Sequence, residues 1–190
     1  REGESFRRTA MVLIMLPMWM NFLLRTYSWM TILENNGLLN QLLQSLGLIS
    51  APLKILNTET AVIIGMIHLL VPYMVLSLVG VLQSIDPNVE YAAYSLGASP
   101  FQTFSKVVFP LSLPGIISGI TMVLIPSIST FYISQKLGNG KFYLIGDAIE
   151  GQYVANNLHF AAAIAFILMI ILLVCMALMQ RLANRKLIVA

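Results

Sequence analysis

Four long apolar runs constrain the fold of this 190-residue chain more than any other feature. The clearest is the run over residues 61–82, which contains no formal charge. A helix of about 20 predominantly apolar residues is long enough to cross the hydrocarbon core of a bilayer. The first run counts as a span only if its helix continues beyond the apolar stretch 9–24 to about Met30. The predicted spans are residues 9–30, 61–82, 114–134 and 158–180.

The composition agrees with a membrane protein. Hydrophobic residues make up 58% of the chain and charged residues 10%, with a mean hydropathy of +0.83, whereas soluble domains carry about 25% charged residues. We therefore expect an all-α, polytopic integral membrane protein that contacts the lipid bilayer. The net charge of +3 is small and the basic residues cluster at span ends, which does not suggest nucleic-acid binding. The chain starts at Arg1 with no initiator Met, so we expect further N-terminal spans before it.

Residues 83–113, here called the bend, form a polar-rich region between two apolar runs. Asp86 can accept hydrogen bonds from the free N–H groups of a helix start, and Pro87 suits the first helical position. Helix-forming residues follow over 88–96. Gly97 supplies the left-handed residue with which a helix can end at little cost. These signals predict one short helix that stops in a sharp turn.

A second short helix is predicted directly after that turn. Ser99 and Gln102 form a capping-box pattern, with Pro100 at the first helical position. Pro110 and Pro114 are expected to close this helix and to begin the next span. The bend therefore reads as helix, turn, helix, a shape suited to docking into a cleft of another protein.

The distribution of basic residues predicts which side the bend faces. If the bend and both termini share one side of the membrane, that side carries seven of the eleven Lys and Arg residues and the other side four. Cytoplasmic loops are enriched in Lys and Arg, so the bend is predicted to be cytoplasmic. The first set is Arg1, Arg7, Arg8, Lys106, Arg181, Arg185 and Lys186, and the second is Arg25, Lys54, Lys136 and Lys141.

The bend resembles the EAA loop of permease subunits in binding-protein-dependent ABC importers. That family's pattern is Glu-Ala-Ala, three residues, Gly, nine residues and then Ile-x-Leu-Pro. The chain has Tyr91-Ala92-Ala93, Gly97 and Val107-Val108-Phe109-Pro110 at that spacing. Tyr91 stands where the family usually has Glu, and Glu90 lies one residue earlier. A role for that carboxylate is therefore either lost here or shifted to Glu90.

The resemblance implies a type I ABC importer transmembrane domain, of which residues 1–190 form a part. It also implies four kinds of partner: two ATP-binding subunits that carry ATP and Mg, a second permease subunit, an extracytoplasmic solute-binding protein and the membrane. The chain has no Walker A glycine loop and no paired metal-ligand spacing, so we expect a non-catalytic subunit without a cofactor or metal of its own. The expected ATPase-coupling residues are Glu90, Ala92, Ala93, Gly97, Ala98, Ser99 and Pro100.

The cargo is indicated by two other stretches. Residues 21–43 and 131–153 resemble the spermidine and putrescine permeases of the family, whereas iron, sulfate or thiamine remain alternative cargoes. A polycation needs aromatic faces and polar groups along its path. The candidate pathway residues are Tyr73, Phe131, Tyr132 and His68, although interfacial aromatics and a packed histidine would look the same.

Two further regions carry site predictions. Residues 135–157 read as a polar outer loop, in which Asp147 and Glu150 could dock the binding protein or form a solvated acidic face. Leucines at helical spacing over 38–46 predict an amphipathic helix that lies on the membrane surface or packs on the spans.

Pro72 and Pro126, each within a span, are either plain kinks or hinges.

Two rival functions come from other classes. An ion-driven secondary transporter would want carboxylates or broken helices near the middle of the membrane. The four predicted spans contain no Asp or Glu, which counts against that rival. A membrane scaffold without transport activity is the other rival, and only an uptake measurement separates it from an importer.

Overall fold

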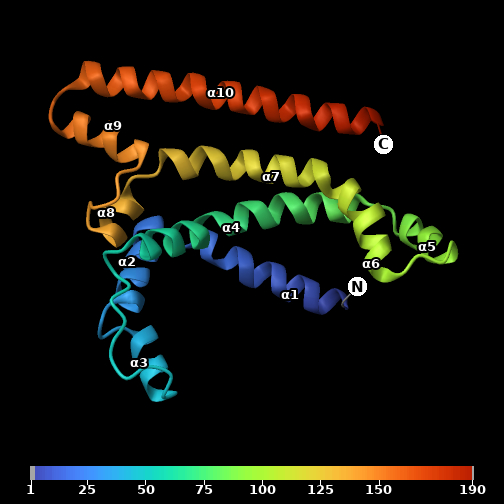
Figure 1. Ribbon diagram of the computed structural model, residues 1–190, viewed down its shortest axis with the longest axis horizontal. Coiled ribbons are helices and arrows are strands. Elements are labelled where there is room, and N and C mark those ends of the chain that lie inside the picture. The colour runs from blue at the N-terminus through green and yellow to red at the C-terminus, as the bar shows by residue number, and fades with distance from the viewer. Residues whose placement is uncertain (1–2, 190) are drawn as a thin grey trace. The chain divides into compact units, whose positions relative to one another are not determined.

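The computed structural model describes residues 3–189, and the regular elements in that range are all helical (Figure 1). The chain divides into two compact units. The first unit holds the described residues up to Pro72 together with Ser127–Ala162, and the second holds Tyr73–Pro126 and the described residues from Ala163 onward. The long helices α4 (Glu59–Ser84), α7 (Phe109–Ser129) and α10 (Leu158–Val189) each contribute to both units.

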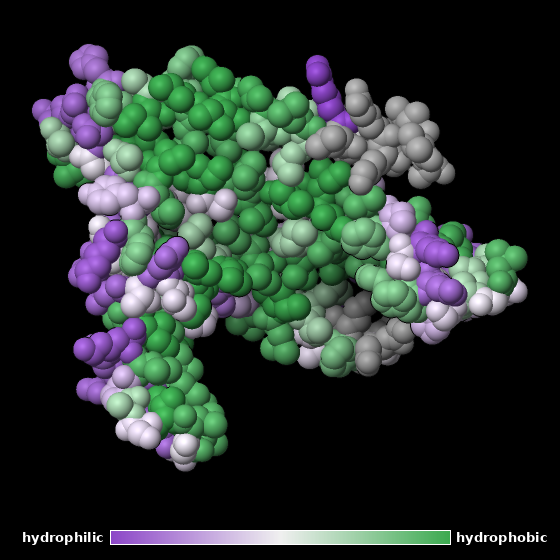
Figure 2. Space-filling view, in the orientation of Figure 1, coloured by the Kyte–Doolittle hydropathy of each residue, from purple (hydrophilic) through white to green (hydrophobic). Residues whose placement is uncertain are grey.

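Three helical stretches are long and apolar enough to cross a membrane: Glu59–Ser84, Pro100–Ser129 and Leu158–Arg181. A fourth crossing exists if the bent pair Arg8–Trp19 and Phe22–Ser45 acts as one span. The prediction of an all-α, polytopic membrane protein is confirmed by this set of helices. Figure 2 shows the apolar side chains as broad green areas over these helices.

The first apolar run does not form the single helix expected over residues 9–30. It forms α1 (Glu4–Met15), a 3₁₀ turn (Leu16–Trp19) and α2 (Phe22–Leu33), and the axis bends by 102°. Pro17 lies in the first turn of the 3₁₀ segment, and Met20 is extended. The side chain of Asn21 then accepts from the N–H of Leu23 at 2.8 Å and starts α2 as a new helix. The sequence-based prediction did not recognise Asn21 as a helix N-cap, because it lies within an apolar run.

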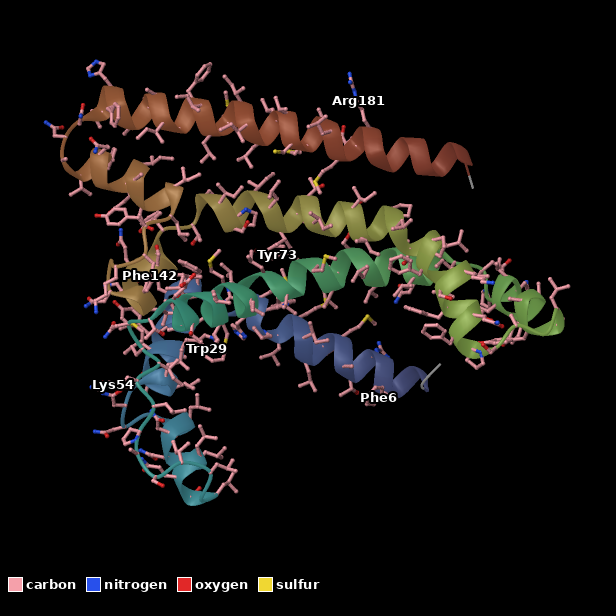
Figure 3. All side chains as sticks on the ribbon, viewed as in Figure 1. Phe6, Trp29, Lys54, Tyr73, Phe142 and Arg181 are labelled. Carbon is pink, nitrogen blue, oxygen red and sulfur yellow. The ribbon has the colours of Figure 1, made fainter. Side chains whose placement is uncertain are left out.

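The core of the first unit forms where α2, α4 and α8 (Tyr132–Gly138) meet. Its buried members are Leu33, Ala61, Val62, Ile133 and Leu137. Trp29 and Phe142, both labelled in Figure 3, pack against this cluster. Gly65 allows the close approach of α4 to α8, because a Cβ at that position would lie 2.3 Å from the Leu137 side chain.

The amphipathic helix predicted over 38–46 is present as α3 (Leu38–Ser45). Its loop is closed by the side chain of Asn40, which is 1% exposed. Asn40 Nδ2 donates to the carbonyl oxygens of Glu34 (3.2 Å) and Leu53 (2.9 Å), and Oδ1 accepts from the N–H of Leu53 (2.9 Å). The polar face of α3 thus contributes a buried side chain, Asn40, that links the backbone at Glu34 to the backbone at Leu53. The leucine face is exposed within this chain, with Leu38, Leu42 and Leu46 each more than half accessible.

The polar loop expected over residues 135–157 is largely helical, so that expectation is wrong. Helix α8 ends at Gly138, and the following C-cap residue, Asn139, has a φ of 53° in the left-handed region. Helix α9 (Ile145–Val154) follows and leads to α10. Gly146 explains why α9 begins so close to the end of α7. A Cβ there would meet the backbone oxygen of Thr130 at 2.5 Å.

In the second unit, α4 and α7 pack through small residues. A Cβ on Gly115 would come within 2.8 Å of Val81, and the hydroxyl of Ser77 donates to the Gly115 carbonyl at 2.9 Å. Close contact through small residues is a common way for membrane helices to associate. Thr121 on α7 in turn lies 3.8 Å from the sulfur of Met179 on α10.

Pro110 and Pro114 do not end the second helix of the bend, contrary to the expectation. Helix α6 (Pro100–Thr103) continues through a π-helical turn (Phe104–Val108) into α7, so helical structure runs unbroken from Pro100 to Ser129. In the π turn the N–H of Phe109 pairs with the carbonyl of Phe104, five residues back. Pro110 has no N–H to donate to the preceding turn, and its ring needs space there. The wider π turn provides that space.

Candidate functional site

The first helix of the bend, α5 (Pro87–Ser95), begins and ends as the sequence predicts. Asp86 Oδ1 accepts from the N–H of Asn88 at 2.9 Å. At the other end Gly97 has φ +83°. Its N–H donates to the carbonyl of Tyr94 (2.9 Å), and the N–H of Ala98 donates to the carbonyl of Ala93 (3.1 Å). This pair of bonds is the Schellman pattern, which holds the turn in one geometry.

The second helix of the bend starts from a complete capping box. The N–H of Ser99 donates to Gln102 Oε1 at 2.9 Å, and the N–H of Gln102 donates to Ser99 Oγ at 3.3 Å. Pro100 occupies the first turn of the helix. The predicted helix–turn–helix geometry is therefore confirmed. On each side of the turn at Gly97, hydrogen bonds to residues no more than five positions away hold the adjoining helix end.

The tip of the bend exposes large apolar side chains, of which the sequence analysis named only Tyr91. Leu96 is 88% exposed and Phe101 77%, on either side of Gly97, and Tyr91 is 65% exposed. Figure 2 shows green residues at this tip beside purple polar ones. Apolar side chains that are exposed together at a polar loop mark an interaction surface. The signal available in the sequence was the position of Leu96 and Phe101 close to the predicted turn at Gly97.

The other predicted coupling residues lie around the same turn. Ala92, Ser99 and Pro100 are exposed, whereas Glu90, Ala93 and Ala98 are half-buried. The alanines leave the backbone close to the surface, where a partner can approach it. The turn itself has room too, because a Cβ added at Gly97 would meet no heavy atom within 4 Å.

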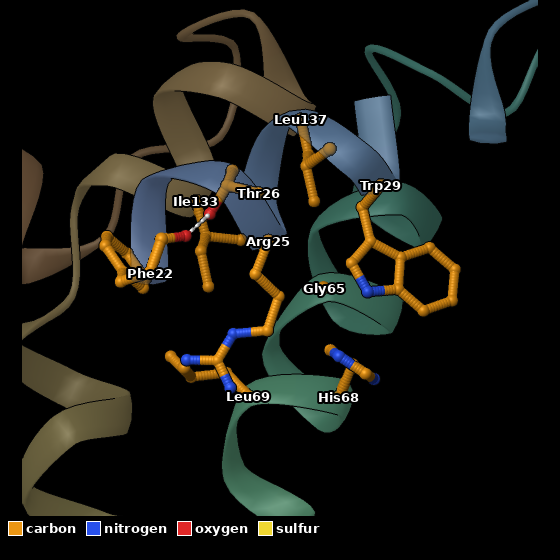
Figure 4. A pocket seen from close by; sticks show the side chains of 9 residues that line it. All are labelled: Phe22, Arg25, Thr26, Trp29, Gly65, His68, Leu69, Ile133 and Leu137. Carbon is orange, nitrogen blue, oxygen red and sulfur yellow. Dashed lines mark hydrogen bonds between the residues drawn. The ribbon is translucent and has the colours of Figure 1, made fainter. Parts of the chain in front are cut away.

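A small cavity in the first unit lies between α2 and α4 (Figure 4). Arg25 and His68 both line it, and the ring of Trp29 contacts the ring of His68 edge-on, with centroids 5.2 Å apart. The cavity volume of about 10 Å³ is close to what one water molecule requires. Arg25 is half-buried and its side chain lines this cavity.

One nitrogen of the Arg25 guanidinium is left without a hydrogen-bond partner in the described part of the chain. Its Nε is buried and has no hydrogen-bond partner among residues 3–189. The nearby hydroxyl of Thr26 is already used, since it donates to the carbonyl of Phe22 at 3.0 Å (Figure 4). An apolar groove of about 460 Å³ also borders Trp29 and His68 and runs along α4 to Pro72.

The predicted pathway residues fall into different places. His68 lines the cavity in the first unit, and Phe22 joins this cavity to Tyr132, whose ring lies 5.5 Å from that of Phe22. Phe131 is exposed and separates α7 from α8. Tyr73 is half-buried and belongs to the second unit. The structure therefore brings His68 and Tyr132 into one neighbourhood.

The two acidic residues proposed to dock a binding protein differ sharply in environment. Asp147 is 6% exposed, and its Oδ2 accepts from Ser134 Oγ (2.6 Å) and from the N–H of Leu144 (2.8 Å). Asp147 therefore ties α8 to the start of α9, and we do not retain it as a docking residue. Glu150 is half-buried and accepts from Gln135 Nε2 at 2.8 Å, so part of its carboxylate is accessible.

Replacing Asp147 by alanine is expected to destabilise the fold by about 3 kcal/mol, because buried hydrogen bonds to a carboxylate are lost and a buried N–H is left without an acceptor. The measurement is the thermal unfolding of the purified, membrane-extracted protein. Glu150→Ala is the matched control, since it removes a carboxylate of the same helix that makes one side-chain hydrogen bond. Equal melting temperatures for the two variants would contradict the structural role of Asp147.

Comparison with known proteins places the whole described chain in one group. Residues 1–189 match the family model described as "Binding-protein-dependent transport system inner membrane component". The chain is 39% identical over 186 residues to the spermidine/putrescine transport system permease protein PotB of Haemophilus influenzae. It is 37% identical over 170 residues to PotB of Escherichia coli K12. These alignments cover 96% and 89% of the chain but 65% and 62% of the two relatives, so the chain spans less than two thirds of their length.

Solved structures with the same fold are more distant in sequence. A bacterial ABC transporter involved in the import of alginate matches with a TM-score of 0.75 and 16% identity, over 97% of this chain and 68% of that one. The same kind of transporter in complex with an alginate-bound periplasmic protein matches with a TM-score of 0.74. At this identity the match establishes a shared fold of ABC importer transmembrane subunits and says nothing about cargo.

Proposed function

The chain belongs to the family of inner membrane components of binding-protein-dependent transport systems, and on that premise we propose that it is a pore-forming permease subunit of an ATP-driven polyamine importer. The subunit itself is non-catalytic. ATP and Mg bind to two partner ATPase subunits, a second permease subunit completes the pore, and a solute-binding protein delivers the cargo. The expectation from sequence that this is an ABC importer permease is confirmed at the level of the family.

The observation that carries the proposal is the construction of the bend. Local hydrogen bonds fix the turn at Gly97, and the helix after the turn is continuous with a membrane-crossing segment up to Ser129. A load applied at the exposed tip is therefore transmitted along one helix into the membrane. A flexible loop at this position would absorb the movement instead.

The tip offers the surface for this contact. Leu96, Phe101 and Tyr91 present apolar area to a cleft in the ATPase subunit, while Ala92 and Ala98 allow close backbone approach. Interfaces take most of their affinity from a few such buried anchors. ATP-driven closure of the ATPase pair then moves the bend, and with it α7, toward the outward-open state. Glu90 lies in the first turn of α5, where its charge is favourable to the helix dipole.

Polyamines are the proposed cargo because the chain is similar to spermidine/putrescine transport system permease proteins. The 37–39% identity to the PotB proteins extends over 170–186 residues. The proposed pathway residues are Tyr132, His68, Tyr73 and Phe131. Aromatic faces attract ammonium groups without binding them as strongly as paired carboxylates would.

The experiment for this function is uptake of radiolabelled spermidine into vesicles that contain the complete permease–ATPase assembly and the binding protein. We expect uptake that requires ATP and persists when ion gradients are collapsed. Uptake that follows an ion gradient without ATP would favour the secondary-transporter rival. Absence of uptake for spermidine, putrescine, iron, sulfate and thiamine would favour a scaffold.

Charge reversal at Glu150 is expected to weaken docking of the binding protein about five-fold at low ionic strength, with a smaller effect at high salt, because exposed charge pairs are screened. The measurement is the dissociation constant of the binding protein for the Glu150→Lys assembly at two salt concentrations. Glu150→Gln keeps an acceptor for Gln135 and controls for the hydrogen bond. An unchanged affinity at low salt would count against docking at this residue.

A further inference from the structure

A lysine of α8 lies over two tyrosine rings in the first unit. The Nζ of Lys136 is 5.9 Å from the ring centroid of Tyr27 on α2 and 5.6 Å from that of Tyr132 on α8. Both distances are within the range of cation–π attraction. Tyr132 and Lys136 lie four residues apart, and therefore on the same face of α8, whereas Tyr27 comes from a different helix. The three side chains are therefore brought together by the packing of α2 against α8.

The two tyrosines form a surface open to a ligand. Tyr27 is 48% exposed and Tyr132 is half-buried, with the centroid of its ring 5.5 Å from that of Phe22. The neighbouring hydroxyl of Tyr27 raises the pKa of Tyr132 above its usual value. The ring faces of the two tyrosines are the groups that this surface offers to a cation. Phe22 also lines the cavity of Arg25 and His68, which places the tyrosine pair next to that cavity.

Lys136 presents a primary ammonium on a flexible alkyl chain to the rings of Tyr27 and Tyr132. A polyamine ends in the same chemical group. We propose that the Tyr27–Tyr132 pair is a subsite for one ammonium group of the cargo, and that Lys136 occupies it while the cargo is absent. This inference rests on the proposed polyamine importer and adds to it a named subsite and an internal competitor.

The arrangement suits transport because the exchange is nearly balanced. The cargo ammonium replaces an equivalent ammonium on the same two rings, so the net change in free energy is small. A path must attract its cargo and also release it, and a subsite with an internal competitor does both. The internal lysine lowers the apparent affinity by the fraction of time that it occupies the rings.

The test measures the dissociation constant of radiolabelled spermidine for the complete permease–ATPase assembly in nanodiscs without binding protein, by equilibrium dialysis. Tyr132→Leu is expected to raise the constant about two- to five-fold, because the cation–π contribution of one ring is lost. Lys136→Met is expected to lower it about three-fold, because the competitor is gone. Tyr132→Phe, which keeps the ring face, should lose less affinity than Tyr132→Leu.

Lys141→Met is the control for charge, since Lys141 is exposed in the segment between α8 and α9 and lies over no aromatic ring of residues 3–189. It removes one positive charge without emptying the rings, so its dissociation constant should stay close to the unaltered value. A decrease equal to that of Lys136→Met would overturn the competitor role and assign the effect to general electrostatics. An increase in the constant for Lys136→Met would also overturn it, as would no binding in either the unaltered or the Lys136→Met assembly.

The failure of this inference is separable from failure of the proposed function. ATP-driven spermidine uptake is measured in parallel on the unaltered assembly with its binding protein. If that uptake is present and Tyr132→Leu, Tyr132→Phe and Lys136→Met share the unaltered dissociation constant, the subsite is wrong and the function stands. If uptake is absent, the function itself is wrong. Size-exclusion chromatography of each variant shows that the assembly is intact.

Discussion

Gly97→Val is expected to uncouple uptake from ATP hydrolysis about ten-fold while the subunit still inserts and assembles. Gly97 has φ +83°. A residue with a Cβ costs about 1–2 kcal/mol in this region, which shifts the population of the native turn by about 5–30-fold. Valine is β-branched and is among the worst residues for it. A Cβ at Gly97 meets no atom of the described residues within 4 Å, so the strain of adding it comes from the backbone conformation and not from a clash of the Cβ.

The predicted consequence is uncoupling. When the turn opens, the hydrogen bonds from Gly97 to Tyr94 and from Ala98 to Ala93 are lost, and the exposed Leu96 no longer has a fixed position. The measurement is the ratio of spermidine molecules taken up to ATP molecules hydrolysed by the reconstituted assembly. We expect this ratio to fall about ten-fold, following the population of the native turn.

Gly47→Val is the matched control for that experiment. Gly47 has φ +69°, and a Cβ there also meets nothing within 4 Å, so the two substitutions carry a similar backbone strain. It lies just after α3, outside the bend. The ratio of uptake to hydrolysis should be preserved in this variant. Normal coupling by Gly97→Val, or equal loss in both variants, would contradict a docking role for the bend.

The bend was predictable because its determinants are local. Asp86 bonds two residues ahead, the Schellman bonds span three and five residues, and the capping box at Ser99 spans three. Each of these interactions depends on residue types at fixed short spacings, which a sequence displays directly. The apolar runs of α4 and α10 were predictable for the same reason, since length and hydropathy alone decide whether they can span.

The features that were missed depend on contacts between distant residues. Asn40 bonds to Leu53 and Asp147 bonds to Ser134, each thirteen residues away. A polar side chain in a polar stretch gives no sign that it will be buried by such a partner. The continuous helix through Pro110 was missed for another reason. Proline is read as a helix end, and the π turn that accommodates it has no sequence signature of its own.

The tyrosine pair shows how far the candidate pathway could be predicted. Tyr132 was identified from its residue type and its place in the stretch 131–153. Its partners Tyr27 and Lys136 were not, because only the packing of α2 against α8 brings Tyr27 within reach. The 102° turn between α1 and α2 sets the direction of α2, whereas the sequence predicts one span over residues 9–30.

Gly146→Ala is expected to destabilise the first unit by about 3 kcal/mol, the upper end of the usual cost of overpacking. The added Cβ would lie 2.5 Å from the carbonyl oxygen of Thr130 and 2.7 Å from that of Ser129. Both atoms belong to the backbone at the end of α7, so neither can move without displacing a helix end. The same shift would pull Asp147 away from Ser134 and weaken their 2.6 Å hydrogen bond.

Gly151→Ala separates this packing effect from the helix propensity of alanine. Gly151 lies in the same helix, α9, and a Cβ there meets nothing within 4 Å. Alanine is favoured over glycine in a helix by up to about 1 kcal/mol, so this variant should be as stable as the unaltered protein or slightly more stable. The measurement is the melting temperature of the purified protein in detergent. If both variants melt together, α9 does not pack against α7 as closely as described, and Asp147 would then be free to face a partner.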